Sequence, residues 1–265
     1  MNSWVSLALT ALLLALPRVL MTRGEADAAA RIKPEIHGDL AFYWWVIRFY
    51  TWFWHRLQHV GWAPLPETGP AVLISNHTCC IDHLLLQSSC RRVLGFMIAR
   101  EFFELPIVHA FCVRVGCIPV NRDGRDLQAI RVALRALNEG KVLPIFPEGK
   151  VTANSGRTLG PMLPGAAFIA VRSGAPVIPA YIYGSPLTDD IAQSLLWRSR
   201  ARVRFGPPID ISDFKPSQAG DKNVLARVSD RFERALLELQ AQCLGADPEA
   251  GSETIETSSE QARAG

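Results

Sequence analysis

Short apolar runs alternate with helical stretches over most of the chain. The apolar runs have the length of buried strands, and we predict strands over residues 71–75, 93–99, 117–120, 142–146, 177–183 and 201–205. Helical patterns predict helices over residues 82–90, 126–138, 164–172 and 222–243. Strands that alternate with helices predict an α/β fold, in which helices cover both faces of a mixed, largely parallel sheet.

The segment from Leu40 to Trp54 is the most aromatic part of the chain. It holds nine aromatic residues among fifteen, against 23 in the whole chain. Tryptophan and tyrosine favour the membrane–water interface, because their rings are apolar while an N–H or O–H group still bonds water. Arg48 and His55 place polar groups among the rings, as expected of a helix that lies in the interface. The alternative is a core helix that happens to be aromatic.

A second apolar run, from Trp4 to Leu16, precedes this segment. Its thirteen residues are fewer than the ~20 that a spanning helix needs, although the run can be extended across Arg18 to Met21. The length also suits the core of a signal peptide, and Met21 offers a second start. We predict that residues 1–62 associate with a membrane, whether the first run spans it, is cleaved or precedes the true start.

Prolines and a glycine between residues 64 and 70 break the helical pattern and indicate a domain boundary. The predicted catalytic domain covers residues 63–215, and an amphipathic helix follows over residues 216–245. Residues 246–265 are rich in Ala, Glu, Ser and Gly, which predicts a disordered tail.

Composition and charge indicate a folded globular protein and disfavour a nucleic-acid-binding one. Apolar residues make up 49% of the chain and the net charge is +3, so a sizeable core is available. Arginines alternate with other residues from 198 to 204, which indicates one face of a strand rather than a basic run for nucleic acid. The six cysteines form no C-x-x-C pair and suggest buried thiols. Nucleotide fingerprints are absent, and we expect neither a metal nor a cofactor.

His77 and Asp82 carry the first chemical signal, because they follow the predicted strand 71–75. Open α/β sheets bind ligands at the carboxyl ends of their strands. With His77 in a turn and Asp82 in the first helical turn, Asp82 can accept from one ring nitrogen and leave the other as a base. Taken alone, the pair also fits a helix N-terminus at which Asp82 serves the helix dipole.

Three further blocks surround the same predicted crevice. Residues 146–149 read Phe-Pro-Glu-Gly and end another buried strand, so that Glu148 and Gly149 project to the same side. Residues 116–122 read Gly-Cys-Ile-Pro-Val-Asn-Arg and deliver a cation after a short strand. Residues 177–180 read Val-Ile-Pro-Ala.

In this order and spacing, the four blocks resemble the glycerolipid acyltransferases, the family of lysophosphatidic acid acyltransferase and glycerol-phosphate acyltransferase. The resemblance covers residues 64–210. It implies transfer of a fatty acyl group from acyl-coenzyme A or acyl carrier protein to the free hydroxyl of lysophosphatidic acid or a related lysophospholipid. It also implies an enzyme on the cytoplasmic face of the inner membrane, whose partners are membrane lipid and the acyl thioester donor.

The resemblance implies roles for individual residues. His77 matches the catalytic base and Asp82 its partner, in the block N-H-x-x-x-x-D, the HX4D motif. Arg122 matches an arginine that holds the substrate phosphate, a role suited to a planar cation. Glu148 is expected to bind the acceptor hydroxyl or to hold the loop. The other residues expected at the substrate site are Asn76, Arg100, Gly149 and Lys150.

One departure from the family pattern leaves the acceptor open. The family often continues Phe-Pro-Glu-Gly with Thr-Arg, whereas this chain has Lys150 and Val151. Glycerol 3-phosphate and a non-glycerol lyso-lipid therefore stay as alternative acceptors. A catalytically silent lipid-binding protein is disfavoured by the intact His77 and Asp82. A serine hydrolase is disfavoured because the chain has no G-x-S-x-G elbow.

Overall fold

The computed structural model describes residues 36, 38–121, 126–152 and 154–246. The apolar run from Trp4 to Leu16, the candidate Arg122 and the tail from residue 247 onward lie outside the described residues.

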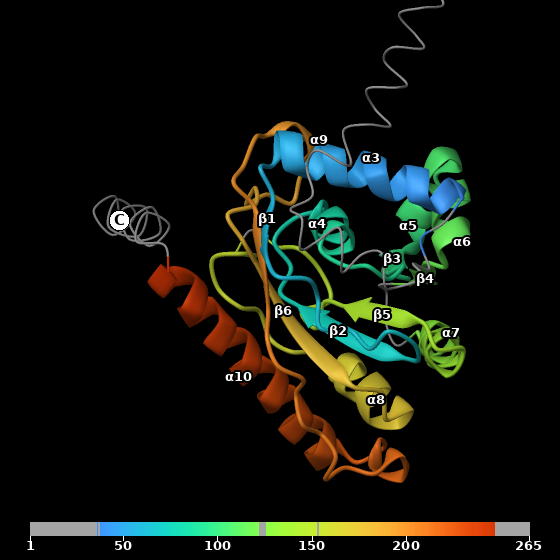
Figure 1. Ribbon diagram of the computed structural model, residues 1–265. Helices are drawn as coiled ribbons and strands as arrows, with labels where there is room; N and C mark the ends of the chain where they lie inside the picture. Colours follow the sequence, from blue (N-terminus) through green and yellow to red (C-terminus); the bar gives the residue numbers. More distant parts are fainter. Residues whose placement is uncertain (1–35, 37, 122–125, 153, 247–265) are drawn as a thin grey trace, which may run out of the picture. The chain divides into compact units, whose positions relative to one another are not determined.

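A five-stranded mixed sheet forms the centre of the described residues (Figure 1). In spatial order its strands are β1 (Gln58–Val60), β7 (Arg202–Phe205), β6 (Val177–Tyr183), β2 (Ala71–Ser75) and β5 (Val142–Ile145). Neighbouring strands are parallel except β6 and β7, which are antiparallel. Every residue of β2 and β5 is buried, as the continuous apolar runs predicted for strands covered on both faces.

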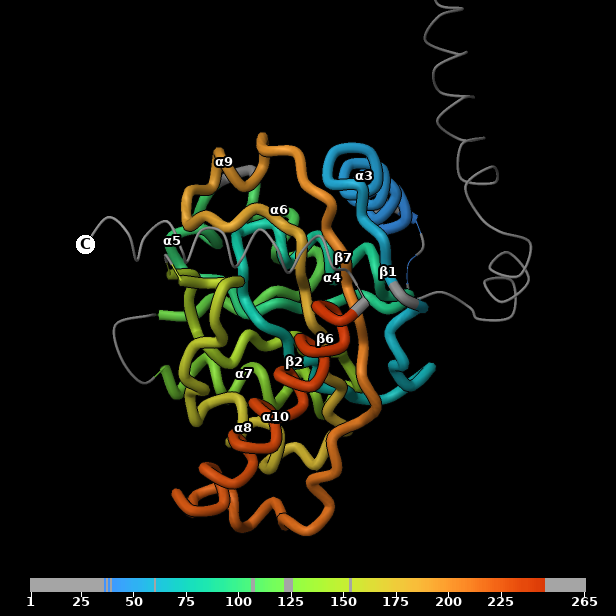
Figure 2. Tube along the Cα trace, turned by 90° about the vertical axis from the view of Figure 1, so that its left-hand side faces the viewer, coloured from blue at the N-terminus to red at the C-terminus, as the bar shows by residue number. Residues whose placement is uncertain are grey.

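Helices cover both faces of this sheet, as predicted. Side chains of β2 alternate between the two faces: Val72 and Ile74 belong to one buried cluster, Ala71 and Leu73 to the other. The first face is covered by three helices, α7 (Leu127–Asn138), α8 (Pro164–Ser173) and α10 (Lys222–Ala246). The second is covered by α4 (Asp82–Ser88), on which α3 (Asp39–Trp54) packs in turn. Figure 2 shows α3 above the strands and α8 below them, with α10 in front.

The strands predicted at 93–99 and 117–120 are shorter than expected and stand outside the main sheet. They form β3 (Met97–Ala99) and β4 (Ile118–Val120), which pair with each other in parallel. Leu94, just before β3, forms a parallel bridge with Val142 at the start of β5, so β3 runs in the same direction as β5. Two helices that the sequence did not predict connect β3 to β4: α5 (Arg100–Phe103) and α6 (Pro106–Val115).

Three more elements complete the described chain. The strand β1, the helix α9 (Ile191–Leu196) and the 3-10 turn η1 (Pro216–Gln218) were not predicted. The strand predicted at 201–205 begins at Arg202, so that the arginines at 198 and 200 precede it instead of sharing its face. All six cysteines are free thiols, of which five are buried.

The aromatic helix α3 has two different faces. Its polar residues point inward: Arg48 donates to the Ser88 carbonyl at 2.7 Å, Thr51 bonds the Ser88 hydroxyl, and His55 is fully buried. The expectation that His55 lies among the exposed rings was therefore wrong, because its two ring nitrogens are bonded inside the protein. The exposed large side chains are Phe42, Tyr43, Val46, Phe49, Trp52 and Phe53. Of the helices within the described residues, none is long and apolar enough to cross a bilayer.

Candidate active site

Asn76 extends the sheet beyond the end of β2. Its Nδ2 donates to the Ile182 carbonyl at 2.9 Å, and the Ile182 N–H donates to Asn76 Oδ1 at 2.7 Å. The side chain is buried, and both of its polar atoms bond the backbone of β6. Asn76, which the resemblance places at the substrate site, thus holds the loop after β2 against the neighbouring strand.

His77 and Asp82 meet in this loop, five residues apart. The distance from His77 Nδ1 to Asp82 Oδ2 is 2.7 Å, and the Asp82 side chain is fully buried. The same Oδ2 accepts the N–H groups of Thr78 at 2.5 Å and Cys79 at 3.1 Å. An ionised carboxylate can only accept, so Nδ1 carries a proton and the neutral ring keeps its lone pair on Nε2.

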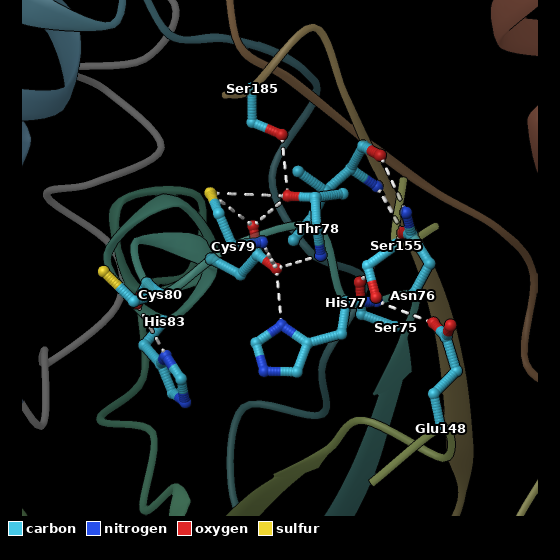
Figure 3. Close-up of polar contacts among 12 residues, drawn as sticks. Ser75, Asn76, His77, Thr78, Cys79, Cys80, His83, Glu148, Ser155 and Ser185 are labelled. Carbon is cyan, nitrogen blue, oxygen red and sulfur yellow. Dashed lines mark hydrogen bonds and ion pairs between the residues drawn. The ribbon is translucent and has the colours of Figure 1, made fainter. Parts of the chain in front are cut away.

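The imidazole of His77 is held in one plane. Phe146 stacks on it with 4.0 Å between ring centroids and 11° between planes. In Figure 3 the second ring nitrogen points away from Thr78 and Cys79, and no described residue bonds it. The ring of His83 lies edge-on to that of His77, with 5.7 Å between the ring centroids. Nε2 is therefore the atom of this pair that a reacting group can approach.

Two hydroxyl groups continue the chain of bonds on the other side of Asp82. The Thr78 hydroxyl donates to Asp82 Oδ1 at 2.5 Å, and it lies 2.7 Å from the Ser185 hydroxyl. Because Thr78 has one hydroxyl proton, Ser185 donates in the second bond. Thr78 lies next to His77 in the motif, but nothing in the sequence indicated that its hydroxyl bonds Asp82. Ser185 follows β6 by two residues, and only the tertiary fold shows its role.

Glu148 joins three segments of the site. Its Oε1 accepts the backbone N–H of His77 at 2.8 Å, and its Oε2 accepts the N–H of Gly160, also at 2.8 Å. Gly149 adopts a left-handed φ of 78°, and a Cβ at this position would collide with Leu163. The turn after β5 thus needs a glycine here, and of the two expected roles of Glu148 its contacts fit the one that holds the loop.

The candidate cations lie where strands end. Arg100 follows β3, its side chain is 43% exposed, and its Nε donates to Asn121 Oδ1 at 2.7 Å. Since β3 runs parallel to β5, Arg100 follows the carboxyl end of β3 in the same direction in which Glu148 follows the carboxyl end of β5. Lys150 is exposed beside Gly149. The next residue after Asn121 is Arg122, which the described residues do not include.

The cysteines beside the histidine are poor nucleophiles. Burial, reinforced by the nearby Asp82 carboxylate, raises the pKa of the Cys79 thiol. Burial likewise raises the pKa of Cys80. Since the thiolate is the reactive form, neither thiol is activated at neutral pH. The described residues contain no group of three His, Cys, Asp or Glu side chains that could hold a metal ion.

Comparison with known proteins adds independent findings. Residues 56–183 match the family model described as Acyltransferase. The 1-acyl-sn-glycerol-3-phosphate acyltransferase of Bacillus subtilis is 24% identical over 177 residues, which cover 66% of this chain and 84% of the relative. The enzyme of the same name from Streptococcus pneumoniae is 30% identical over 166 residues, 62% of this chain and 59% of the relative. This chain spans 52% of a chloroplastic relative from Brassica napus, which is 27% identical.

A solved structure shares the fold. The 1-acyl-sn-glycerophosphate acyltransferase PlsC from Thermotoga maritima superposes with a TM-score of 0.58 and 18% identity, over 89% of this chain and 93% of that one. The shared fold and the matched domain define the class as an acyltransferase of α/β architecture. Residues 56–183 thus resemble the glycerolipid acyltransferases, a family of O-acyltransferase enzymes, as the four sequence blocks predicted.

Proposed function

We propose that this protein transfers a fatty acyl group from an acyl thioester to the free hydroxyl of lysophosphatidic acid, in phospholipid biosynthesis. The observation that carries the proposal is the bond from His77 Nδ1 to the buried Asp82, which leaves Nε2 as a base. The choice of acceptor rests on the relatives, which are named 1-acyl-sn-glycerol-3-phosphate acyltransferases.

In the proposed reaction, Nε2 of His77 takes the proton of the acceptor hydroxyl while that oxygen attacks the thioester carbonyl. The carbon–oxygen bond forms, the carbon–sulfur bond breaks, and the thiolate leaves and receives the proton from His77. Asp82 stabilises the imidazolium in between, because four hydrogen bonds fix its carboxylate beside the ring. Such acid–base assistance contributes about 10²–10⁴-fold to the rate.

The cations and turns at the strand ends would bind the acceptor. Arg100, with Arg122 and Lys150, would bind its phosphate, since a guanidinium pairs with phosphate through two parallel bonds. Glu148 and Gly149 would shape the floor of the site, and Asn76 would hold the loop that carries His77.

The exposed rings of α3 support a place at the membrane. Six large apolar side chains on one helix face are more than a water-exposed surface usually gathers. We expect this face to lie in the interface of the inner membrane on its cytoplasmic side, where lysophospholipid and the acyl donor meet.

Product analysis tests the proposal. Detergent extracts of membranes that contain the protein receive a labelled long-chain acyl-coenzyme A or acyl-acyl carrier protein. Lysophosphatidic acid, glycerol 3-phosphate, lysophosphatidylcholine and an amino-acid-derived lyso-lipid are supplied separately. Label in phosphatidic acid from the first acceptor supports the proposal and identifies the donor. Label that appears only with another compound would identify that compound as the acceptor in place of lysophosphatidic acid. Release of fatty acid without transfer would indicate a hydrolase.

A further inference from the structure

The short helix α9 and the residues around it present a second apolar surface, which no sequence pattern indicated. Its five large apolar side chains are each at least 39% exposed, and Leu196 reaches 67%. They are Leu187, Ile191, Leu195, Leu196 and Trp197. A surface of this size on so short a segment indicates a partner.

Hydrogen bonds attach this segment to the aromatic helix α3. The Tyr50 hydroxyl donates to the Leu195 carbonyl at 2.7 Å, and Trp54 Nε1 donates to the Leu196 carbonyl at 3.0 Å. The guanidinium of Arg198 lies 4.9 Å from the ring centre of Trp54. Figures 1 and 2 show α3 and α9 on the same side of the sheet. The apolar side chains around α9 and the exposed rings of α3 therefore belong to one side of the protein.

Three arginines stand where the two segments meet. Arg56 follows α3, and Arg198 and Arg200 follow α9; all three are exposed, and none forms an ion pair with a described residue. The carboxylates of Asp189 and Asp190 lie at the opposite, N-terminal end of α9. Arginines beside exposed rings and leucines are complementary to a surface that is anionic outside and apolar beneath. Trp197 lies between the apolar Leu196 and the cationic Arg198 in the chain, as expected of a tryptophan at a membrane interface.

The same segment adjoins the candidate active site. The Ser185 hydroxyl bonds Thr78, and Cys80 Sγ lies 3.8 Å from the Ile191 carbonyl. Residues just before α9 and at its first turn thus touch the loop that carries His77.

We infer that α9, its flanking residues and α3 form one surface that binds an anionic lipid bilayer, with Leu195, Leu196 and Trp197 inserted among the lipids. This surface extends the membrane role proposed for α3, and on a bilayer it would bring the loop of His77 close to the lipid. An acceptor anchored by its acyl chain would then reach the site without leaving the bilayer.

Hydrogen–deuterium exchange of the full-length protein tests where lipid touches it. The protein is measured alone, with phosphatidylcholine vesicles, and with vesicles that also contain phosphatidylglycerol. We expect residues 187–200 to exchange more slowly with the anionic vesicles, while residues 237–244 on α10 do not change. Unchanged exchange over 187–200 in vesicle-bound protein would overturn the inference.

Paired variants measure how much the exposed leucines of α9 contribute to vesicle binding. Leu195→Ser with Leu196→Ser removes two exposed leucines of α9, and Leu237→Ser with Leu244→Ser removes two exposed leucines of α10. We expect about tenfold weaker binding to anionic vesicles for the α9 variant alone, with unchanged melting temperature in both. Equal binding by the two variants would contradict the proposed surface.

Acylation rates on vesicle-embedded and on monomeric acceptor distinguish a role of α9 in lipid delivery from the proposed catalytic function. With lysophosphatidic acid embedded in vesicles, the α9 variant should lose rate about tenfold, whereas a short-chain, monomeric lysophosphatidic acid should be acylated at the wild-type rate. Equal loss on both acceptors would contradict a role in lipid delivery. Absence of transfer by the wild-type protein would reject the proposed function and leave the vesicle-binding result standing.

Discussion

Glu148 accepts a hydrogen bond from the backbone N–H of His77 across 71 positions of the chain, at 2.8 Å. The other carboxylate oxygen binds the N–H of Gly160. One side chain of the Phe-Pro-Glu-Gly block therefore positions the proposed base and closes the loop that follows. The contact uses the main chain of His77, so it does not depend on the imidazole.

Glu148→Gln tests whether this residue supports the loop or binds the acceptor. Glutamine has one acceptor oxygen for two N–H groups, so one of them loses its partner, at a cost of about 1–3 kcal/mol. We expect a lower melting temperature together with a lower kcat. A higher KM at unchanged melting temperature would instead indicate direct binding of the acceptor. Melting by circular dichroism and steady-state kinetics measure the two quantities.

Thr78 supplies a second test of how Asp82 is held. Thr78→Val removes the hydroxyl that donates to Asp82 Oδ1 and accepts from Ser185, and so leaves two buried polar groups without that partner. We expect kcat to fall about tenfold with KM nearly unchanged, because the interaction orients the base rather than the substrate.

Thr78→Ser is the control for this substitution, because it keeps the hydroxyl. We expect it to retain most of the activity. If the valine and serine variants have equal kcat, the hydroxyl does not position Asp82.

Arg100→Ala tests the proposed phosphate site. Loss of a cation that we propose to pair with the phosphate should raise the KM for lysophosphatidic acid about tenfold, with kcat changed less than twofold. The control is Arg135→Ala on α7, which removes another exposed arginine. Equal KM values for the two variants would exclude Arg100 from acceptor binding.

His55 predicts how stability depends on pH. Burial lowers its pKa from 6.5 to about 4. Tyr50 donates its hydroxyl proton to Leu195, so the neutral ring of His55 donates from Nε2 to Tyr50 and accepts from Ser199 at Nδ1. Between pH 6.5 and 4 the unfolded chain binds a proton that the folded chain does not, so stability falls as the pH falls.

The loss from this group amounts to at most ~3 kcal/mol at pH 4. Thermal unfolding of the wild type and His55→Gln between pH 7 and 4 measures it. We expect the difference in stability between the two proteins to shrink as the pH decreases. A difference that stays constant over this range would show that His55 titrates alike in both states.

The strands and long helices could be predicted because each is encoded locally. The apolar runs of β2, β5 and β6 are continuous, since both faces of these strands are buried. On α7 the apolar residues Ile130, Leu134 and Leu137 recur at helical spacing and pack in the core, and Gly140 follows the end of that helix with a φ of 80°.

The elements that could not be predicted depend on tertiary partners. The strand β1 has three residues and is defined by its pairing with β7. The helix α9 has six residues, and its exposed leucines give no amphipathic pattern that points to a core. In the same way, the sequence singled out His77 and Asp82, which lie close in the chain, but not Ser185, whose bond to Thr78 spans 107 positions.

The most direct test of the proposed mechanism is the rate of phosphatidic acid formation by purified wild type and His77→Ala. Both are given labelled acyl-coenzyme A, or acyl-acyl carrier protein if that is the donor, and lysophosphatidic acid. The variant keeps the backbone N–H that binds Glu148, so we expect its melting temperature to stay close to that of the wild type. We predict that kcat falls by about 10²–10⁴-fold, the contribution expected of a general base. A folded His77→Ala protein that forms phosphatidic acid within a few-fold of the wild-type rate would contradict the mechanism.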